Sequence, residues 1–283
     1  MRKIKFVVLL SVLLTVHLMI NAQSLKMMTY NIRLDVASDG ENDWTHRKEY
    51  FTSQIKFYEP DVFGVQEALP NQVIDIATYL PAYNYVGTGR DGIGKGESSN
   101  IYYKRGRFTV KQEGTFWLSQ TPDTVSKGWD AALNRVCTYA LLEDNQSENN
   151  IWVFNTHLDH IGELARTKSI ELIVSKINAF NTKNYPVVFM GDFNSEPSTD
   201  RIKWLKKVMT DSRDVSVEKP FGPSGTFNGF KFNEPVTKLI DYIFISQPLI
   251  ITVKKYAVLS DSKDLRYPSD HLPVYVELEI NNH

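Results

Sequence analysis

Short runs rich in β-branched and aromatic residues recur along the chain from Lys26 onward, each bounded by Gly, Pro, Asn or Asp. Runs of this kind are typical of β-strands. The pattern predicts strands at residues 26–32, 61–66, 100–104, 107–119, 135–143, 150–158, 186–191, 239–246, 251–259 and 272–280. The chain is therefore expected to be rich in β-structure.

Helical spacing interrupts these strands in a few places. The clearest is segment 163–180, where apolar residues three and four positions apart line one face of a helix. These residues are Ile170, Ile173, Ile177 and Phe180. Shorter helices are expected at residues 44–58, 71–80 and 199–209. Because no repeat, linker or break in composition divides the chain, we expect one α/β (α+β) domain with two or more sheets and a few covering helices.

The first residues have the layout of a secretory signal rather than of the fold. Basic residues at positions 2, 3 and 5 precede the apolar run 6–20, and the small residue Ala22 follows. The run is short for a membrane span and contains His17, so a retained anchor is the weaker interpretation. We expect a signal peptide at 1–22, a domain at 23–283, and export to the periplasm or the extracellular space.

Composition and charge narrow the functional classes. The 283 residues are 42% hydrophobic, enough for one sizeable core, and a single cysteine excludes a disulfide scaffold. The chain has 32 basic and 33 acidic residues, and loss of the signal would leave 29 against 33, a net charge of −4. Proteins that hold duplex nucleic acid usually carry a basic footprint. This charge disfavours long duplex DNA without excluding short nucleic acids. No stable protein partner is implied, and a monomer is favoured while the oligomeric state stays open.

Polar residues stand at the ends of six predicted strands in a consistent way. Four strands have one at or just after their end: Asn31, Glu67, His157, and Asp192 with Asn194. Two strands have one at or just before their start: Asp241, and the pair Asp270 and His271. These groups meet at one edge only if the last two strands run opposite to the other four. The pattern predicts mixed or antiparallel sheets and one site built from six segments.

The chemistry of these side chains favours a hard metal ion and hydrolysis. Oxygen ligands from Asn, Glu and Asp, without cysteine, suit Mg²⁺ or Mn²⁺ better than structural zinc. Two histidines beside carboxylates allow proton transfer and contacts to an anion. Together these groups indicate hydrolysis of a phosphate ester rather than of a peptide or a glycoside.

The six segments resemble, in order, the motifs of the endonuclease/exonuclease/phosphatase (DNase I-like) superfamily, and within it a secreted bacterial member. They read TYNIR, VQEAL, NTHLDH, MGDFNSEP, LIDYIF and SDHLPV, and the resemblance runs from about Lys26 to Ile280. It implies a four-layer α/β sandwich, with two mixed, mainly antiparallel sheets packed face to face and helices outside. It also implies a divalent-metal-dependent phosphoric ester hydrolase that directs an activated water in line at a phosphate ester, with a phosphodiester as the leading substrate.

The same resemblance implies metal ligands. Glu67 is the principal metal carboxylate, with Asn31 and Asp270 as further candidate ligands. Magnesium keeps several waters and needs few protein ligands, so this small set is sufficient. The implied cofactor is Mg²⁺ or Mn²⁺.

Five residues receive catalytic roles from the resemblance. Asp192 and His271 activate the attacking water or stabilise the developing charge, and the choice of general base between them is open. Asp241 orients His271. Asn194 holds a phosphate or metal-bound oxygen, and His157 donates to a phosphate oxygen.

Four further residues resemble a narrower pattern within secreted bacterial members. Arg135, His160 and Arg166 are candidates for substrate binding, since an arginine at the rim can clamp a phosphate oxygen with two parallel donors. Asp159 is a fourth candidate. It could instead cap the helix that begins near Gly162.

Several alternatives stay open at this point. The substrate could be a short DNA or RNA, a sphingolipid or phospholipid head group, or an inositol phosphate. An inactive binding module would show a degraded motif, and none is found. A zinc hydrolase built on His157 and His160 lacks a third ligand. The segment GTGRDG at 87–92 matches a dinucleotide fingerprint but precedes a strand instead of a helix, so it is interpreted as a mobile substrate loop.

Overall fold

The computed structural model describes residues 23–246 and 251–280. The expected signal peptide at 1–22 lies outside the described residues, as do residues 247–250 and 281–283. Within the two described ranges, no helix has the length and hydropathy required to cross a membrane.

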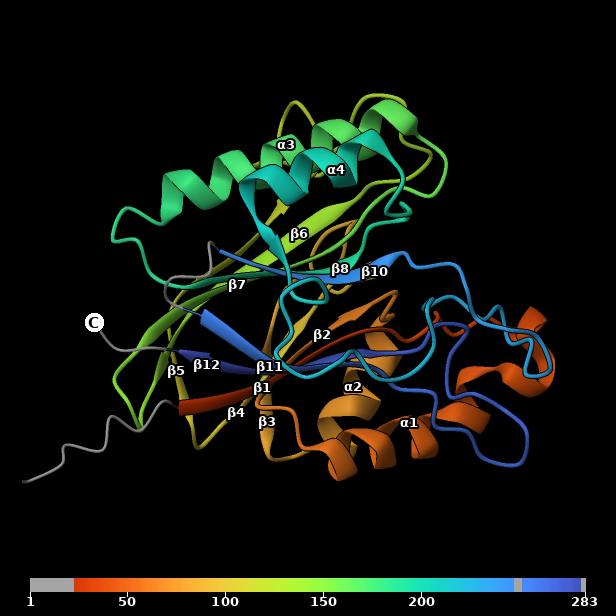
Figure 1. The fold of residues 1–283 in the computed structure, drawn as a ribbon. Coiled ribbons are helices and arrows are strands. Elements are labelled where there is room, and N and C mark those ends of the chain that lie inside the picture. Colours follow the sequence, from red (N-terminus) through yellow and green to blue (C-terminus); the bar gives the residue numbers. More distant parts are fainter. Residues whose placement is uncertain (1–22, 247–250, 281–283) are drawn as a thin grey trace, which may run out of the picture.

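Two sheets form the centre of the molecule, each with six strands in the described part of the chain (Figure 1). The first sheet has the order β11 (Ile251–Val258), β12 (Val274–Ile280), β1 (Gln23–Asn31), β2 (Val62–Gln66), β4 (Ile101–Lys104), β3 (Tyr83–Val86). The second has the order β5 (Phe108–Trp117), β6 (Val136–Asp144), β7 (Asn150–His157), β8 (Val187–Asp192), β10 (Asp241–Ile245), β9 (Thr210–Asp211).

Helices cover the outer face of each sheet, which gives four layers (Figure 1). Their bounds are α1 (Trp44–Tyr58), α2 (Pro70–Tyr79), α3 (Glu163–Phe180) and α4 (Asp200–Val208), and a 3-10 helix, η1 (Ala37–Asn42), precedes α1. The helices α1 and α2 lie on the first sheet, and α3 and α4 lie on the second. The four-layer α/β sandwich expected from the sequence is confirmed.

Each predicted helix and strand has a counterpart in the structure, and two observed strands have no counterpart in the prediction. These are β3 and β9. Both are edge strands with a partner on one side only, and β9 has just two residues. A short strand with one neighbour buries few side chains, so it leaves little pattern in the sequence.

Strand direction agrees with the argument from polar strand ends. The pairs β1–β2 and β7–β8 are parallel, while β12 runs antiparallel to β1 and β10 runs antiparallel to β8. The ends of the four earlier strands and the starts of the two later ones therefore lie at the same edge of the sandwich. The other neighbouring strands are antiparallel, so both sheets are mixed.

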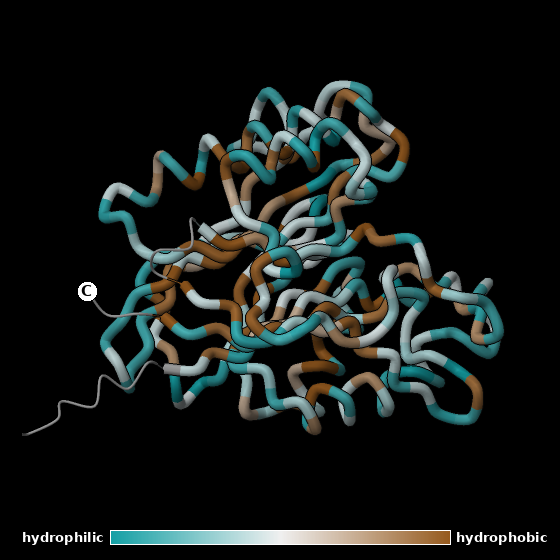
Figure 2. Tube along the Cα trace, viewed as in Figure 1, coloured by the Kyte–Doolittle hydropathy of each residue, from teal (hydrophilic) through white to brown (hydrophobic). Residues whose placement is uncertain are grey.

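Alternate side chains of the central strands enter different cores. In β8, Val188 and Met190 pack between the two sheets, whereas Val187 and Phe189 pack with residues of α3 and α4. A third core joins the outer face of the first sheet to α1 and α2. Figure 2 shows hydrophobic stretches along the central strands of both sheets. Burial on both faces explains why these strands are apolar nearly throughout.

One buried polar residue, Asn155 of β7, joins the two sheets. Its Nδ2 donates to the carbonyl oxygens of Val65 and Asn100, both at 2.9 Å, and its Oδ1 accepts from Gln66 Nε2 at 2.7 Å. A Cβ added at Gly64 would lie 2.6 Å from Asn155 Cγ. Glycine at this position therefore makes room for the bridging amide.

Replacing Asn155 with Leu should lower the free energy of unfolding by about 3 kcal/mol, because several buried polar groups lose their partner at about 1–3 kcal/mol each. Urea unfolding followed by circular dichroism measures this change. The matched control is Asn233→Leu at an exposed position, where a change under about 0.5 kcal/mol is expected. An unchanged urea midpoint for the Asn155 variant would show that this bridge does not stabilise the sandwich.

Candidate active site

Side chains from both sheets line one cavity of about 310 Å³ at the shared edge of the strands. Six of the eight residues expected as catalytic groups or metal ligands line it: Glu67, His157, Asp192, Asn194, Asp270 and His271. Asn31 and Asp241 lie behind them, almost completely buried, and are hydrogen-bonded to residues of the cavity. The structure thus brings together all eight residues that were expected as catalytic groups or metal ligands.

The Asn31 amide connects the two sheets at this edge. Its Nδ2 donates to Glu67 Oε1 and to Asp192 Oδ2, both at 3.0 Å. Its Oδ1 accepts the backbone N–H of Arg33 at 3.0 Å. Glu67 Oε2 also accepts the backbone N–H of Leu34 at 3.0 Å. One side chain therefore fixes the separation of two carboxylates that belong to different sheets.

Two cavity residues have a left-handed backbone. Glu67 has a φ of 66° and follows β2, and Asn194 has a φ of 44° and lies two residues after the end of β8. Such values are uncommon for residues other than glycine and concentrate at functional sites. The backbone N–H of Asn194 donates to Asp192 Oδ1 at 2.8 Å, which fixes the carboxylate from its own loop.

His271 and two carboxylates form a buried chain of charged groups. His271 Nδ1 lies 2.8 Å from Asp241 Oδ2, and its Nε2 lies 3.7 Å from Asp192 Oδ2. Burial alone would lower the pKa of His271, but the charge and hydrogen bond of Asp241, with the charge of Asp192, raise it to about 10. The imidazole is therefore protonated at neutral pH and donates to Asp241.

The environment of Asp192 favours its neutral form, since this carboxylate is buried beside a second acid. Burial and the charge of Asp241 raise the pKa of Asp192 to about 7, against the charge of His271 and the N–H of Asn194. A carboxylate whose pKa is close to neutral is suited to accept a proton from water.

His157 faces Asp192 from the end of β7. Its Nε2 lies 3.4 Å from Asp192 Oδ2 and 3.0 Å from Asn194 Nδ2. Burial, followed by the positive charges of Arg135 and His271, lowers the pKa of His157 well below its ordinary value. His157 is therefore neutral, and its buried Nδ1 has no hydrogen-bond partner among the residues described.

Oxygen donors for a divalent cation lie on the Glu67 side of the cavity. The Asp270 carboxylate is buried, and burial raises its pKa, with the charge of Glu67 adding to the rise against His271. Its contact within the described chain is the Ser269 hydroxyl at 3.4 Å. Glu67 and Asp270 thus place two carboxylates at one cavity, and the carboxylate of Asp270 has only this long hydrogen bond among the residues described. A hard cation between them would relieve their repulsion.

A second acidic group also offers ligand atoms for a metal. Atoms of Asp192, Asp241 and His271 lie within 4.8 Å of one another. The imidazole of this group is protonated and hydrogen-bonded to Asp241, so it has no free lone pair in this arrangement. The donor chemistry therefore favours Glu67 and Asp270 as the metal side.

The four residues of the narrower pattern occupy different places. Arg135 and His160 line the cavity, and Arg135 Nη2 lies 3.1 Å from His160 Nδ1. Asp159 and Arg166 are not among its lining residues. Asp159 Oδ1 accepts the N–H of Gly162 at 2.7 Å, and Arg166 Nη1 donates to the Asp159 carbonyl oxygen at 2.9 Å. This pair orders the loop that leads into α3. The role of Asp159 therefore resembles the helix cap that was its alternative interpretation.

The N-terminus of α3 is itself capped from a distant segment. The backbone N–H groups of Leu164 and Ala165 donate to Asp130, at 3.2 and 2.6 Å. A carboxylate at a helix N-terminus also interacts favourably with the helix dipole. Asp130 therefore binds the first N–H groups of α3, a role that the sequence suggested for Asp159.

Four charged or aromatic residues of the cavity are not identified from the sequence: Arg33, Glu97, Phe227 and Lys238. Arg33 stands two positions after Asn31, which is the one local signal for it. Its guanidinium is paired with Asp39 at 2.8 and 2.9 Å. Glu97 follows the glycine-rich segment, so its relation to the cavity depends on how that loop folds back. Nothing local in the sequence distinguishes Phe227 or Lys238.

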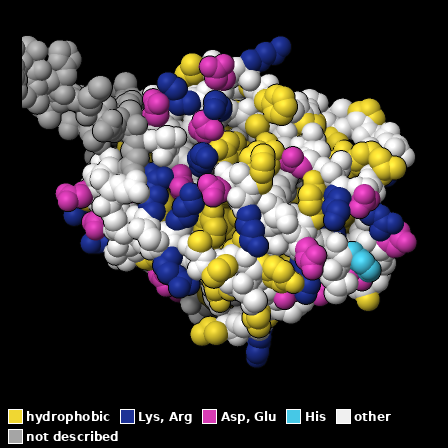
Figure 3. Space-filling view, turned by 90° about the horizontal axis from the view of Figure 1, so that it is seen from below, with side chains coloured by type: hydrophobic (Ala, Val, Ile, Leu, Met, Phe, Trp, Pro, Cys, Tyr) yellow, Lys and Arg dark blue, Asp and Glu magenta, His cyan; other side chains and the backbone are white. Residues whose placement is uncertain are grey.

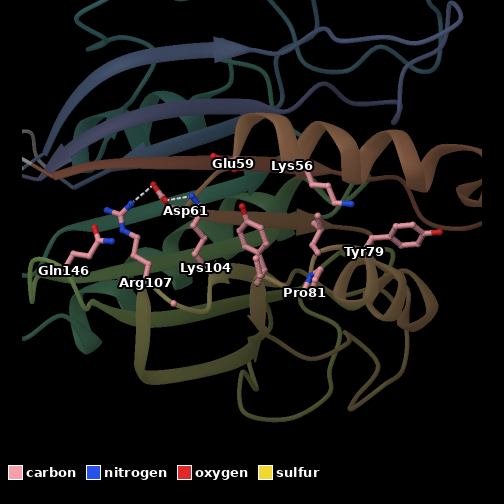
Figure 4. Close-up of a pocket in the computed structure, with 12 residues that line it drawn as sticks. Lys56, Glu59, Asp61, Tyr79, Pro81, Lys104, Arg107 and Gln146 are labelled. Atoms are coloured by element: carbon pink, nitrogen blue, oxygen red, sulfur yellow. Dashed lines mark hydrogen bonds and ion pairs between the residues drawn. The ribbon is translucent and has the colours of Figure 1, made fainter.

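A larger cavity, of about 520 Å³, lies beside the start of β2 and the end of β4 (Figure 4). Asp61 in its wall pairs with Lys104 Nζ at 2.9 Å and Arg107 Nη1 at 2.7 Å, and it accepts the backbone N–H of Lys26 at 2.8 Å. These contacts hold strand ends together. Size alone therefore does not locate the chemistry of this molecule.

Comparison with solved structures gives close matches over nearly the whole chain. A crystal structure of an endonuclease/exonuclease/phosphatase family protein from Bacteroides thetaiotaomicron is 35% identical with a TM-score of 0.87, covering 92% of this chain and 99% of that one. A mannosyl-6-phosphatase from Bacteroides thetaiotaomicron VPI-5482 is 36% identical with a TM-score of 0.85, covering 90% of this chain and 99% of that one.

Sequence comparison agrees with the structural matches. An uncharacterised protein of Acanthamoeba polyphaga mimivirus is 28% identical over 161 residues, and the match spans 54% of this chain and 60% of that protein. A model of the Endonuclease/Exonuclease/phosphatase family matches residues 28–271. The chain belongs to the endonuclease/exonuclease/phosphatase family.

Proposed function

We propose that this protein is an exported, divalent-metal-dependent phosphatase that hydrolyses a phosphate monoester on a sugar. The observation that carries the proposal is the arrangement of Glu67, Asp192 and His271 around one cavity, held by Asn31 and Asp241. Family members are phosphatase- and nuclease-type hydrolases. The mannosyl-6-phosphatase relative supports the choice of a phosphatase and of a sugar phosphate.

The residues of the cavity divide the work of hydrolysis. A Mg²⁺ or Mn²⁺ ion held by Glu67 and Asp270, with Asn31 beside them, would neutralise charge on the phosphate. Asp192 accepts a proton from the attacking water, whose oxygen bonds to phosphorus as the bond to the sugar oxygen breaks. The sugar leaves as an alcohol once that oxygen takes up a proton. Protonated His271 stabilises the negative charge of the phosphoryl group.

Neutral His157 and the Asn194 amide complete the proposed phosphate site. Both line the cavity beside Asp192. His157 Nε2 accepts from the Asn194 amide at 3.0 Å, so the neutral imidazole carries its proton on Nδ1 and adds no charge next to protonated His271. The two histidines therefore take separate roles: His157 positions the Asn194 amide, and His271 stabilises charge.

The supply of hydrogen-bond donors supports a monoester. Arg135 is 5% exposed and lines the cavity together with His160, Arg33 and Lys238. A phosphate monoester has three non-bridging oxygens and a diester has two, so additional donors fit the monoester better. The phosphodiester suggested by the sequence stays a prediction, and a substrate panel distinguishes the two.

The surface supports a small substrate. Figure 3 shows basic and acidic side chains interspersed on the face seen from below, without a broad area of one sign. Long duplex DNA needs a continuous basic track. The mixed charge of this face and the net charge of −4 expected after loss of the signal favour a compact ester over a polymeric duplex, and export rests on the N-terminal pattern of the sequence.

Asp192→Asn should reduce kcat about 100-fold or more, because a general base contributes at least that factor. The raised pKa of Asp192 means that its contribution to stability is present below about pH 4 and is lost as pH rises through about 7. Without metal, the variant should therefore become more stable relative to the wild type between these pH values, by about 4 kcal/mol at most. Chemical unfolding in EDTA at pH 4, 6 and 8 measures this difference.

The matched control is Asp123→Asn, because the Asp123 side chain is 87% exposed. This variant should retain activity and show no growing stability difference with pH. A constant difference between Asp192→Asn and the wild type across this range would contradict the raised pKa, and retained activity would remove Asp192 from the mechanism.

Glu67→Gln keeps the acceptor for Asn31 but removes the metal-binding charge. We expect kcat/KM at 1 mM Mg²⁺ to fall by about 100-fold or more, with partial recovery at higher Mg²⁺, since a ligand change weakens the metal site. The substrate panel contains mannose 6-phosphate, p-nitrophenyl phosphate, bis-(p-nitrophenyl) phosphate and a short RNA. The control is Glu113→Gln, at an exposed position of β5, and it should behave as the wild type.

The panel also decides between the proposed substrates. Monoester turnover that exceeds diester turnover supports the phosphatase, and the reverse order supports the phosphodiester. A folded, magnesium-loaded protein that cleaves neither class would refute a phosphoesterase function.

A further inference from the structure

A narrow recess opens beside Glu67 from the active-site cavity. It shares Glu67, Glu97, Arg135 and His157 with that cavity. The remaining lining residues are Arg90, Ser98, Ser99 and Val136. Its volume is about 10 Å³, close to the space that one water molecule occupies. A group the size of a hydroxyl fits there, and a phosphate does not.

The glycine-rich segment holds two charged residues of the recess in place. The Arg90 backbone N–H donates to the Glu97 carbonyl oxygen, and Arg90 Nη2 pairs with Glu97 Oε1, both at 2.8 Å. Trp117 Nε1 donates to the Arg90 carbonyl oxygen at 2.7 Å, and the Ser98 N–H donates to the Ala68 carbonyl oxygen at 2.8 Å. The loop is thereby fixed to β5 on one side and to the metal side of the cavity on the other.

Two hydrogen-bonding groups in the recess are unsatisfied. Arg90 Nη1 is buried and has no partner in the part of the chain that the structure describes. The contact found for Glu97 Oε2 is Arg135 Nη1 at 4.0 Å, which is beyond hydrogen-bonding distance. Arg135 is itself almost fully buried, so this gap does not arise from a mobile surface side chain. The residues that line this space for one small group thus include a buried donor without a partner and a carboxylate oxygen without a hydrogen bond among the residues described.

We propose that the recess binds one hydroxyl of the sugar that carries the phosphate, so that the substrate class is a hexose phosphate or a related polyol phosphate. The hydroxyl donates to Glu97 Oε2 and accepts from Arg90 Nη1, because a hydroxyl is both a donor and an acceptor. A phosphate oxygen of a second phosphoryl group would only accept, and Glu97 would repel it. An aromatic or alkyl group would leave both protein groups unpaired.

This assignment rests on the proposed phosphatase function and adds a specificity-determining pair, Arg90 and Glu97, to it. The test compares a substrate with hydroxyls, mannose 6-phosphate, and one without, p-nitrophenyl phosphate. For Glu97→Gln, kcat/KM on mannose 6-phosphate should fall about tenfold or more, because a neutral amide replaces the charged acceptor and no longer pairs with the Arg90 guanidinium. Turnover of p-nitrophenyl phosphate should change by less than about threefold, since that substrate leaves the recess empty.

Two further variants keep the result interpretable. Arg90→Lys retains the charge but changes the donor geometry, and it should show the same selective loss on the sugar phosphate. Glu113→Gln removes a carboxylate outside the recess and should affect neither substrate. Circular dichroism confirms that each variant is folded. An equal loss on both substrates in the folded Glu97 and Arg90 variants would overturn the hydroxyl subsite.

Binding measured without turnover separates this proposal from the phosphatase function. In magnesium, mannose 6-phosphate should raise the melting temperature of the slow variant Asp192→Asn more than inorganic phosphate does, and the additional change Glu97→Gln should abolish the difference. If no monoester is hydrolysed but this difference is found, the phosphatase function fails and the subsite is retained. Equal shifts for the two ligands in Asp192→Asn would overturn the subsite and leave the recess as a site for one water.

Discussion

The buried amide of Asn31 holds together two carboxylates that their charges would drive apart. Glu67 and Asp192 come from different sheets, and each accepts one N–H of the same Nδ2 at 3.0 Å. In a buried environment such charge-assisted hydrogen bonds are strong, and an unpaired carboxylate is costly. This contact requires that β1 and β8 end at the same edge of the sandwich. The distance between the proposed metal side and the proposed base is therefore a property of how the sheets pack.

Around this link, the fold gives different protonation states to chemically identical groups. His271 is protonated because Asp241 lies 2.8 Å from its Nδ1, while His157 is neutral because it is buried near Arg135 and His271. Asp192 has a raised pKa because it is buried next to Asp241. Groups whose environments drive their pKa values apart are the groups that acid–base chemistry needs. The buried chain of Asp241, His271 and Asp192 therefore accounts for the different pKa values of these groups.

The sequence predicts the catalytic side of the molecule better than the substrate side. Polar residues at strand ends were sufficient to predict the relative direction of six strands. A buried strand has no structural need for a polar side chain at its end, so six such residues together indicated one shared site. Asp159 and Arg166 show the limit of a motif, because the same residues can order a loop instead of lining the cavity. The edge strands β3 and β9 were missed because they bury few side chains.

Arg90 and Glu97 could not be assigned from local pattern for a different physical reason. Their relation to Glu67 depends on a loop that folds back through contacts with Trp117 and Ala68, distant in sequence from the loop itself. Strands fix the catalytic groups to a rigid frame, whereas the recess is built on a loop whose sequence can change without altering that frame. Such a division lets one sandwich keep its phosphate chemistry while loop residues determine which alcohol carries the phosphate. For this chain, the proposed hydroxyl subsite assigns that choice to Arg90 and Glu97, which line the recess beside Glu67.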